Sequence, residues 1–252
     1  MMLSRFLPEF IKRRIRANQF YVRCIKILRG GGLSYSQRYE DCIVRGMFYC
    51  LGVDKPSYID IGANSPFSLS NTAMFYEQGS TGINIEPNPR LFEAIASVRK
   101  KDINLMIGIG TSEGVLPFYE MDANTLSTFS EDEAKTICDK YGFKIINVIP
   151  VQVKTLKSVV DEYCGGVFPD FMSLDTEGLD EMILSTLKDC PSLPKIICTE
   201  TWEYGLKVHH IPEICAILEP LGYMLFLDNH LNSIFVLKDL WDSAINSKKA
   251  LA

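Results

Sequence analysis

Two segments of the sequence have the residue types and the spacing needed to bind a nucleoside. Residues 58–61 predict a buried strand that stops at Gly62. A second apolar run ends at Glu86, which follows Gly62 by 24 residues, close to the ~20-residue offset at which an acid meets the two ribose hydroxyls. Residues 63–66 lack the further glycines that admit a pyrophosphate. The pattern therefore favours a nucleoside without a pyrophosphate, such as S-adenosylmethionine.

Other acids follow the remaining strands that the sequence predicts. Ligands of open α/β sheets bind beyond the carboxyl ends of the strands, so these ends are the place to look for a site. Polar or glycine residues stand at five such ends: Asp60, Gly62, Asn64, Glu86, Gly108, Gly110, Asp175, Glu177 and Glu200. Because strand ends converge on one crevice, these acids are expected to lie together rather than on a solvated face.

Several motifs in this order resemble the FkbM-type methyltransferases. They lie at residues 60–64, 70–72, 82–89 and 170–178, with a further similar stretch at 35–41. The resemblance covers roughly residues 34–238 and implies the class I methyltransferase fold, which is α/β and doubly wound. Its sheet is Rossmann-like, mostly parallel and seven-stranded, with a C-terminal antiparallel hairpin. The resemblance also implies S-adenosylmethionine as methyl donor and O-methylation of a sugar or another natural-product hydroxyl. Many relatives have Gly or His near residues 64–66, where this chain has Ser65 and Pro66, so the cofactor loop can differ locally.

The glycine turn and the acid after the second strand are the expected cofactor contacts. A carboxylate at position 86 can accept hydrogen bonds from both ribose hydroxyls, and a side chain at position 62 would block the nucleoside. The expected cofactor-binding residues are Asp60, Gly62, Ala63, Asn64, Glu86, Pro87 and Gly108. Two interpretations of Asp60 stay open: it orders the glycine turn or reaches the methionine ammonium, or it is a structural acceptor of loop amides.

Asp175, Glu177 and Glu200 are the candidate catalytic residues. A sulfonium donor needs little help, so in methyl transfer the protein positions the acceptor oxygen and removes its proton. A carboxylate beside a sugar hydroxyl can accept that proton. Alternatively, Asp175 holds the amino group of the cofactor, and Glu177 begins a helix whose dipole suits its charge. His209 and His210 are a runner-up base, or part of a solvated helix start.

Residues that resemble family stretches over the mouth of the site are the candidate acceptor contacts. Trp202 could stack on a sugar face, or it could be a core or lid residue. The candidate contacts are Ser36, Gln37, Asn124, Thr125, Trp202 and His209. No metal is expected, because the acids and histidines match no ligand motif. Two alternatives to O-methylation stay open: N- or carboxyl methylation of a small molecule, and a catalytically idle binding module that keeps the fold.

Composition and charge restrict the remaining possibilities. The chain has 252 residues, 47% of them apolar, which suits one domain with one core. Its eight cysteines form no Cys-x-x-Cys pair, so they are expected to be reduced thiols of a cytoplasmic protein. Residues 1–29 contain eight basic side chains and one acid, which leaves 18 basic and 30 acidic side chains elsewhere. An acidic body argues against a nucleic-acid substrate. A homo-oligomer is a further possibility.

The predicted domains are a basic helical arm at 1–33 and a methyltransferase domain at 34–252. Three capping or breaking signals have a clear mechanism: Asn88 before Pro89 starts a helix, Ser130 with Glu133 forms a capping box, and Pro117 suits an edge strand. Helices are expected at 36–50, 70–78, from 88 onward, and at 131–141, 155–164 and 209–221. Strands are expected at 57–61, 82–86, 103–109, 171–174 and 195–199, with ribbons pairing 114–119 with 145–153 and 223–227 with 233–237.

The basic arm generates a testable prediction. Its eight basic residues alternate with phenylalanine and isoleucine at near-helical spacing, a pattern typical of a helix that binds a membrane surface, here the inner face, or an acidic partner. The other interpretation is a helix that folds onto the acidic body of its own or a second chain. If the arm binds membranes, the full-length protein will co-sediment with anionic vesicles better than a chain starting at Leu33. Equal binding would assign the arm to the fold or to a dimer.

Overall fold

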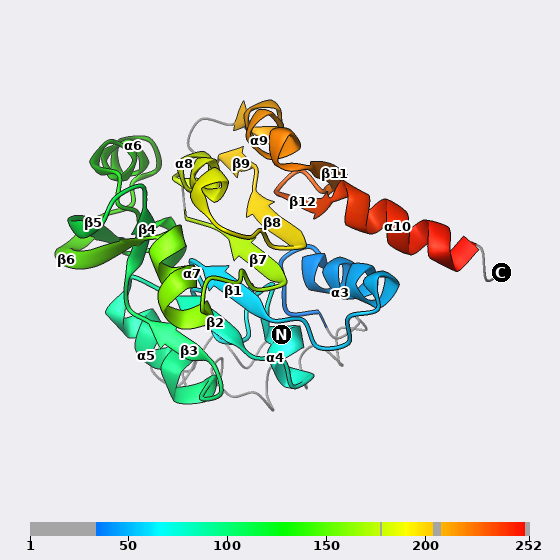
Figure 1. Cartoon of the computed structure of the whole chain (residues 1–252). Helices are drawn as coiled ribbons and strands as arrows, with labels where there is room; N and C mark the ends of the chain where they lie inside the picture. The colour runs from blue at the N-terminus through cyan, green and yellow to red at the C-terminus, as the bar shows by residue number, and fades with distance from the viewer. Residues whose placement is uncertain (1–33, 177, 204–207, 250–252) are drawn as a thin grey trace, which may run out of the picture.

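The computed structural model describes residues 34–176, 178–203 and 208–249, so the predicted arm lies outside the described residues. A seven-stranded sheet forms the centre of the molecule (Figure 1). Its strands, in spatial order, are β11 (Tyr223–Asp228), β12 (Asn232–Leu237), β8 (Ile196–Glu200), β7 (Phe171–Leu174), β1 (Tyr58–Ile61), β2 (Gly82–Ile85) and β3 (Ile103–Leu105). All neighbours are parallel except those of β12, which runs antiparallel to both β8 and β11. This confirms the predicted doubly wound sheet with its C-terminal antiparallel hairpin.

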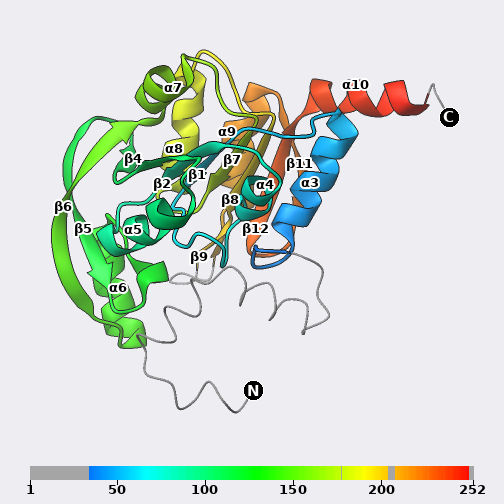
Figure 2. The ribbon, with the colours of Figure 1, turned by 90° about the horizontal axis from the view of Figure 1, so that it is seen from below.

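Helices cover both faces of this sheet. One face packs against α7 (Leu156–Cys164), α8 (Asp180–Ser185) and α9 (Ile211–Leu218). The other packs against α3 (Glu40–Leu51), α4 (Ala73–Glu77) and α10 (Lys238–Lys249). The two layers are separated in Figure 2. Successive side chains of a strand point to opposite faces of the sheet. Ile59 and Ile61 of β1 therefore pack in the core on the α7 side, and Tyr58 packs in the core on the α3 side.

A second, three-stranded sheet stands beside the first. It contains β4 (Gly108–Gly110), β6 (Ile145–Thr155) and β5 (Gly114–Met121), in that order, and α6 (Glu131–Tyr141) lies between β5 and β6 in the sequence. The predicted ribbon is confirmed, with Pro117 on the edge strand β5. The prediction of one strand over 103–109 was wrong. The chain leaves the large sheet after Leu105 and joins the small one at Gly108, where the absence of a side chain admits the Phe129 ring; a β-carbon there would stand 2.4 Å from it.

The predicted helix starts are present in the structure. The Asn88 side chain accepts a hydrogen bond from the backbone of Arg90, and α5 (Pro89–Val98) begins with a proline. The Ser130 side chain accepts one from the backbone of Glu133. α10 and the short antiparallel pair β9 (Trp202–Glu203) and β10 (Val208–His209) were not predicted, and α8 was implied only by the alternative in which Glu177 begins a helix. The 3-10 turns are Asn124–Leu126, Thr186–Asp189 and Glu219–Leu221.

A buried ionic network lies on the α4 side of the sheet. The Arg99 side chain is fully buried; its Nε lies 3.1 Å from Asp102 Oδ2, and its Nη1 donates to Thr72 Oγ1 at 2.9 Å. Asp60 Oδ2 accepts from Thr72 Oγ1 at 2.6 Å and lies 4.0 Å from Arg99 Nη1. Through these contacts Asp60 serves as a structural acceptor. Breaking such a buried ionic pair is costly. None of the helices in the described part of the chain is both long and apolar enough to span a bilayer.

Candidate active site

A cavity of about 1100 Å³ opens at the carboxyl ends of β1, β2, β7 and β8. The small sheet, the loop before α6 and α6 itself contribute its other wall, which includes Phe118, Phe129 and Ile137. Pockets for one small ligand usually measure ~300–1000 Å³. The cavity is therefore large enough for a nucleoside cofactor together with an acceptor.

The turn after β1 forms the floor of the cavity. Gly62 has φ of 81°, and a β-carbon there would stand 1.8 Å from the backbone oxygen of Asp175. Only glycine fits this close approach and this conformation. The turn is tied to the next strand because the N–H of Gly62 donates to the Ile85 carbonyl at 3.0 Å. Asn64, with φ of 50°, then directs its N–H toward Glu86.

Glu86 is buried at the end of β2. Its Oε2 accepts from the Asn64 N–H, and its Oε1 accepts from the Asn88 N–H, each at 2.8 Å. Burial raises the pKa of Glu86 to about 7, with the Asp60 and Asp175 charges adding to the rise and the two backbone hydrogen bonds opposing it. The two N–H groups hold the carboxylate in one orientation in the lining of the cavity. It is thus placed to accept hydroxyl hydrogens, as a ribose requires.

A group of acids lies at the ends of β7 and β8. Leu174 pairs with Thr199 in the register of these strands, so the following residues, Asp175 and Glu200, stand side by side. Burial raises the pKa of Asp175 to about 7; the Asp180 charge adds to this, and a hydrogen bond with Glu200 opposes it. Burial likewise raises the pKa of Asp180 to about 6. The Oδ1 atom of Asp175 is buried with no hydrogen-bond partner among the described residues. The group suits a cationic ligand or a proton-transfer role.

Most of the residues predicted for the site line this one cavity. They are Gln37, Gly62, Asn64, Glu86, Pro87, Gly108, Asn124, Thr125, Asp175, Glu200 and Trp202. Asp60 and Ala63 are not among the lining residues, although Ala63 is buried in the same turn. Ser36 does not line the cavity either, because its hydroxyl donates to Asp41 Oδ1 at 2.9 Å in the turn before α3. Glu177 and the side chain of His209 lie outside the described residues.

Several lining residues were not predicted. Asp180 holds the loop after β7 by accepting from the Thr176 hydroxyl at 3.0 Å, and Glu133 and Glu181 line the cavity from α6 and α8. Sequence spacing gives no sign of these contacts, because they depend on how the helices pack. His210 also lines the cavity. The sequence indicated that a histidine of the pair 209–210 could lie at the site, but it did not show which of the two would line the cavity.

These features agree with a comparison of the sequence with protein families. Residues 60–225 match the family model described as the Methyltransferase FkbM domain. The chain belongs to the FkbM methyltransferase family. No curated protein matches this sequence significantly.

Solved structures of several methyltransferases are distantly similar to this chain. A TehB-like SAM-dependent methyltransferase from Corynebacterium glutamicum is 10% identical, with 88% of this chain and 98% of that chain covered and a TM-score of 0.42. Precorrin-6y C5,15-methyltransferase from Geobacter metallireducens is 13% identical, with 82% and 90% covered and a TM-score of 0.42. The 1,6-didemethyltoxoflavin-N1-methyltransferase from Burkholderia thailandensis, which has bound S-adenosylhomocysteine, is 9% identical, with 92% and 89% covered and a TM-score of 0.41.

S-adenosylmethionine is the cofactor of this FkbM protein, and the residues of the cavity fit it. The glycine at position 62 leaves room where a side chain would stand, and the oriented Glu86 carboxylate suits a ribose diol. The Oδ1 atom of Asp175, which has no hydrogen-bond partner among the described residues, suits a positively charged group such as the sulfonium of the donor. Each of these three features fits a different part of the cofactor.

The first prediction from this geometry concerns Glu86. Replacing Glu86 by Ala should weaken S-adenosylmethionine binding by ~1.5–3 kcal/mol, the usual value of a hydrogen bond to a charged group. Titration calorimetry measures the change. Glu93→Ala, on the following helix and outside the cavity lining, is a matched control. Unchanged affinity in Glu86→Ala would show that the ribose lies elsewhere.

A second prediction follows from the raised pKa of Asp175. The ordinary pKa of this side chain is 3.8 and the folded value is about 7, so the folded protein binds an extra proton between these pH values. That contribution to stability is complete below about pH 4 and is lost as pH rises through 7. Asp175→Asn removes the titration, so its stability relative to the parent should increase from pH 5 to pH 8. Urea unfolding of both proteins tests this, and a pH-independent difference would contradict it.

Proposed function

We propose that this protein transfers the methyl group of S-adenosylmethionine to a hydroxyl of a glycan or a related small molecule. The observation that supports the proposal most strongly is the pair formed by Asp175 and Glu200 at neighbouring strand ends, in the same cavity as Gly62 and Glu86. One carboxylate pair thus faces the space beside the cofactor residues. A hydroxyl acceptor needs such a group, because it has to lose a proton.

Asp175 is the proposed proton acceptor. A general base works best when its pKa lies near the working pH, and the pKa of Asp175 is about 7. S-adenosylmethionine supplies a methyl group already activated by its sulfonium. As the acceptor oxygen forms its bond to that methyl carbon and the sulfur–carbon bond breaks, the hydroxyl proton passes to the Asp175 carboxylate. Glu200, hydrogen-bonded to Asp175, positions the base.

The charge of the cavity favours an uncharged acceptor. Six of its lining residues are acids, and no lysine or arginine is among the described lining residues. A phosphate or carboxylate acceptor would be repelled by this field, which disfavours carboxyl methylation. Gln37, Asn124, Thr125 and Trp202 also line the cavity. Amide, hydroxyl and indole groups of this kind suit a polyol, whose hydroxyls need hydrogen-bond partners and whose ring face needs an apolar surface.

The prediction for catalysis separates the base from the cofactor contacts. Asp175→Asn should lower turnover by ~10²-fold or more, a larger factor than its effect on cofactor affinity, because it removes a group needed in the transition state. Glu177→Gln and Glu200→Gln test the other two candidates. Methyl transfer to a panel of neutral glycans provides the assay, with Asp189→Asn, an exposed acid outside the cavity lining, as control. Parental turnover in all three variants would place proton removal elsewhere.

A further inference from the structure

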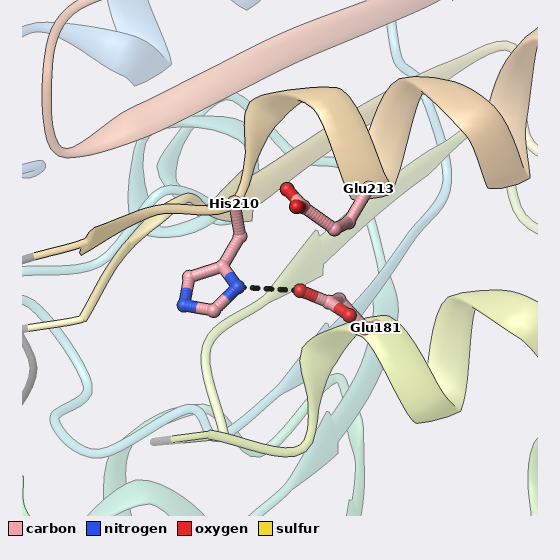
Figure 3. Close-up of side chains that lie close together, drawn as sticks. All are labelled: Glu181, His210 and Glu213. Carbon is pink, nitrogen blue, oxygen red and sulfur yellow. Dashed lines mark ion pairs between the residues drawn. The ribbon is translucent and has the colours of Figure 1, made fainter.

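Three side chains from two parts of the chain, Glu181, His210 and Glu213, lie close together (Figure 3). Glu181 comes from α8, His210 immediately precedes α9, and Glu213 lies in the first turn of α9. One ligand atom from each residue lies within 4.8 Å of the others. Glu181 and His210 are also lining residues of the cavity. The cluster therefore faces the space assigned to the substrates, and it is distinct from the Asp175–Glu200 pair.

The backbone holds these residues in place. The N–H of His210 donates to the Thr201 carbonyl at 2.9 Å, and the carbonyl of His210 accepts from the N–H of Ile214 at 3.0 Å. His210 and Glu213 are three residues apart at a helix start, a spacing that puts two side chains on the same surface. α8 and α9 pack against each other, which brings Glu181 to this surface. The convergence is thus built into the fold.

The charges of the cluster are unbalanced. Nδ1 of His210 lies 2.6 Å from Oε1 of Glu181, and Glu213 has no hydrogen-bond or ion-pair partner among the described residues. One imidazole stands between two carboxylates, beside a cavity whose described lining contains no lysine or arginine. Two carboxylates this close repel each other unless a cation lies between them. The cluster therefore has both the ligand atoms and the charge to bind a divalent ion.

We propose that Glu181, His210 and Glu213 bind a divalent transition-metal ion, Mn²⁺ or Zn²⁺. An imidazole with two carboxylates suits these ions, whereas Mg²⁺ and Ca²⁺ prefer oxygen ligands alone. Ligand atoms lie about 2.0–2.2 Å from such an ion, and hence roughly 3–3.5 Å from one another. Glu213 is exposed at the helix start, so a rotation of its side chain can close the remaining distance. Three protein ligands leave coordination positions open toward the cavity.

The role of the ion rests on the proposed function. An acceptor hydroxyl that occupies an open position becomes more acidic, because the ion stabilises the developing alkoxide. Its proton still passes to Asp175, its oxygen takes the methyl group, and the ion keeps its charge and its protein ligands. The ion would also orient a neutral polyol, which the carboxylate-rich wall alone cannot do by charge attraction.

The test is a titration of the full-length protein with MnCl₂, without acceptor, in which electron paramagnetic resonance measures free Mn²⁺. We expect one Mn²⁺ site whose affinity falls at least tenfold in Glu213→Gln and also falls in His210→Gln. Glu219→Gln, an exposed acid just past the other end of α9, is the matched control and should bind like the parent. A Zn²⁺ competition experiment shows which of the two ions binds more tightly.

Two outcomes would overturn the proposal. One is no Mn²⁺ or Zn²⁺ binding at millimolar concentration, and the other is binding that Glu213→Gln does not weaken, which would assign the ion to other carboxylates. S-adenosylmethionine affinity, measured by calorimetry on the same samples, keeps this test separate from the methyltransferase proposal. If the parent protein binds the cofactor but no metal ion, only the metal-site proposal is refuted. Failure of the parent to bind cofactor would refute the proposed function whatever the metal result.

Discussion

The close approach between the turn after β1 and the end of β7 is the constraint on which the site depends. A β-carbon at Gly62 would stand 1.8 Å from the Asp175 carbonyl, so the turn can lie against β7 only with glycine at this position. The N–H of Asp175 in turn donates to the Ile61 carbonyl at 3.0 Å. These contacts bring the ends of β1 and β7 to one level. The N–H of Asn64 then donates to Glu86, so the end of β2 is held in a fixed position relative to the ends of β1 and β7.

The same geometry has an energetic cost. Glu86, Asp175 and Asp180 are packed where burial raises the pKa of each, so ionising them in the empty cavity opposes folding. In the ionic network around Arg99 a buried guanidinium opposes this cost, although burial still raises the pKa of Asp60. Unpaired buried acids persist in proteins mainly where function needs them. In the proposed reaction, a cationic donor and a proton-accepting base are two such needs.

Local signals in the sequence predicted much of the fold. Asn88 and Ser130 cap helices through contacts a few residues away, so their roles could be inferred without tertiary information. The strand over 103–109 could not be placed correctly, because the change of sheet depends on the packing of Phe129 against Gly108. Asp60 shares a strand face with Tyr58 and accepts a hydrogen bond from Thr72, a contact that depends on tertiary packing, so the sequence could not decide between its two interpretations. Its distant partner, Arg99, carried no signal in the sequence.

Charge also connects the steps of the proposed reaction. With a pKa of about 7, Asp175 is partly protonated in the empty cavity at neutral pH. Arrival of a cation favours the ionised carboxylate, so the donor increases the fraction of Asp175 that is in its active, ionised form. Methyl transfer removes the sulfonium charge at the same moment as Asp175 takes up a proton. After the transfer, the protonated Asp175 and the uncharged thioether of the by-product no longer attract each other as the carboxylate and the sulfonium did, and this loss of attraction favours release of the by-product.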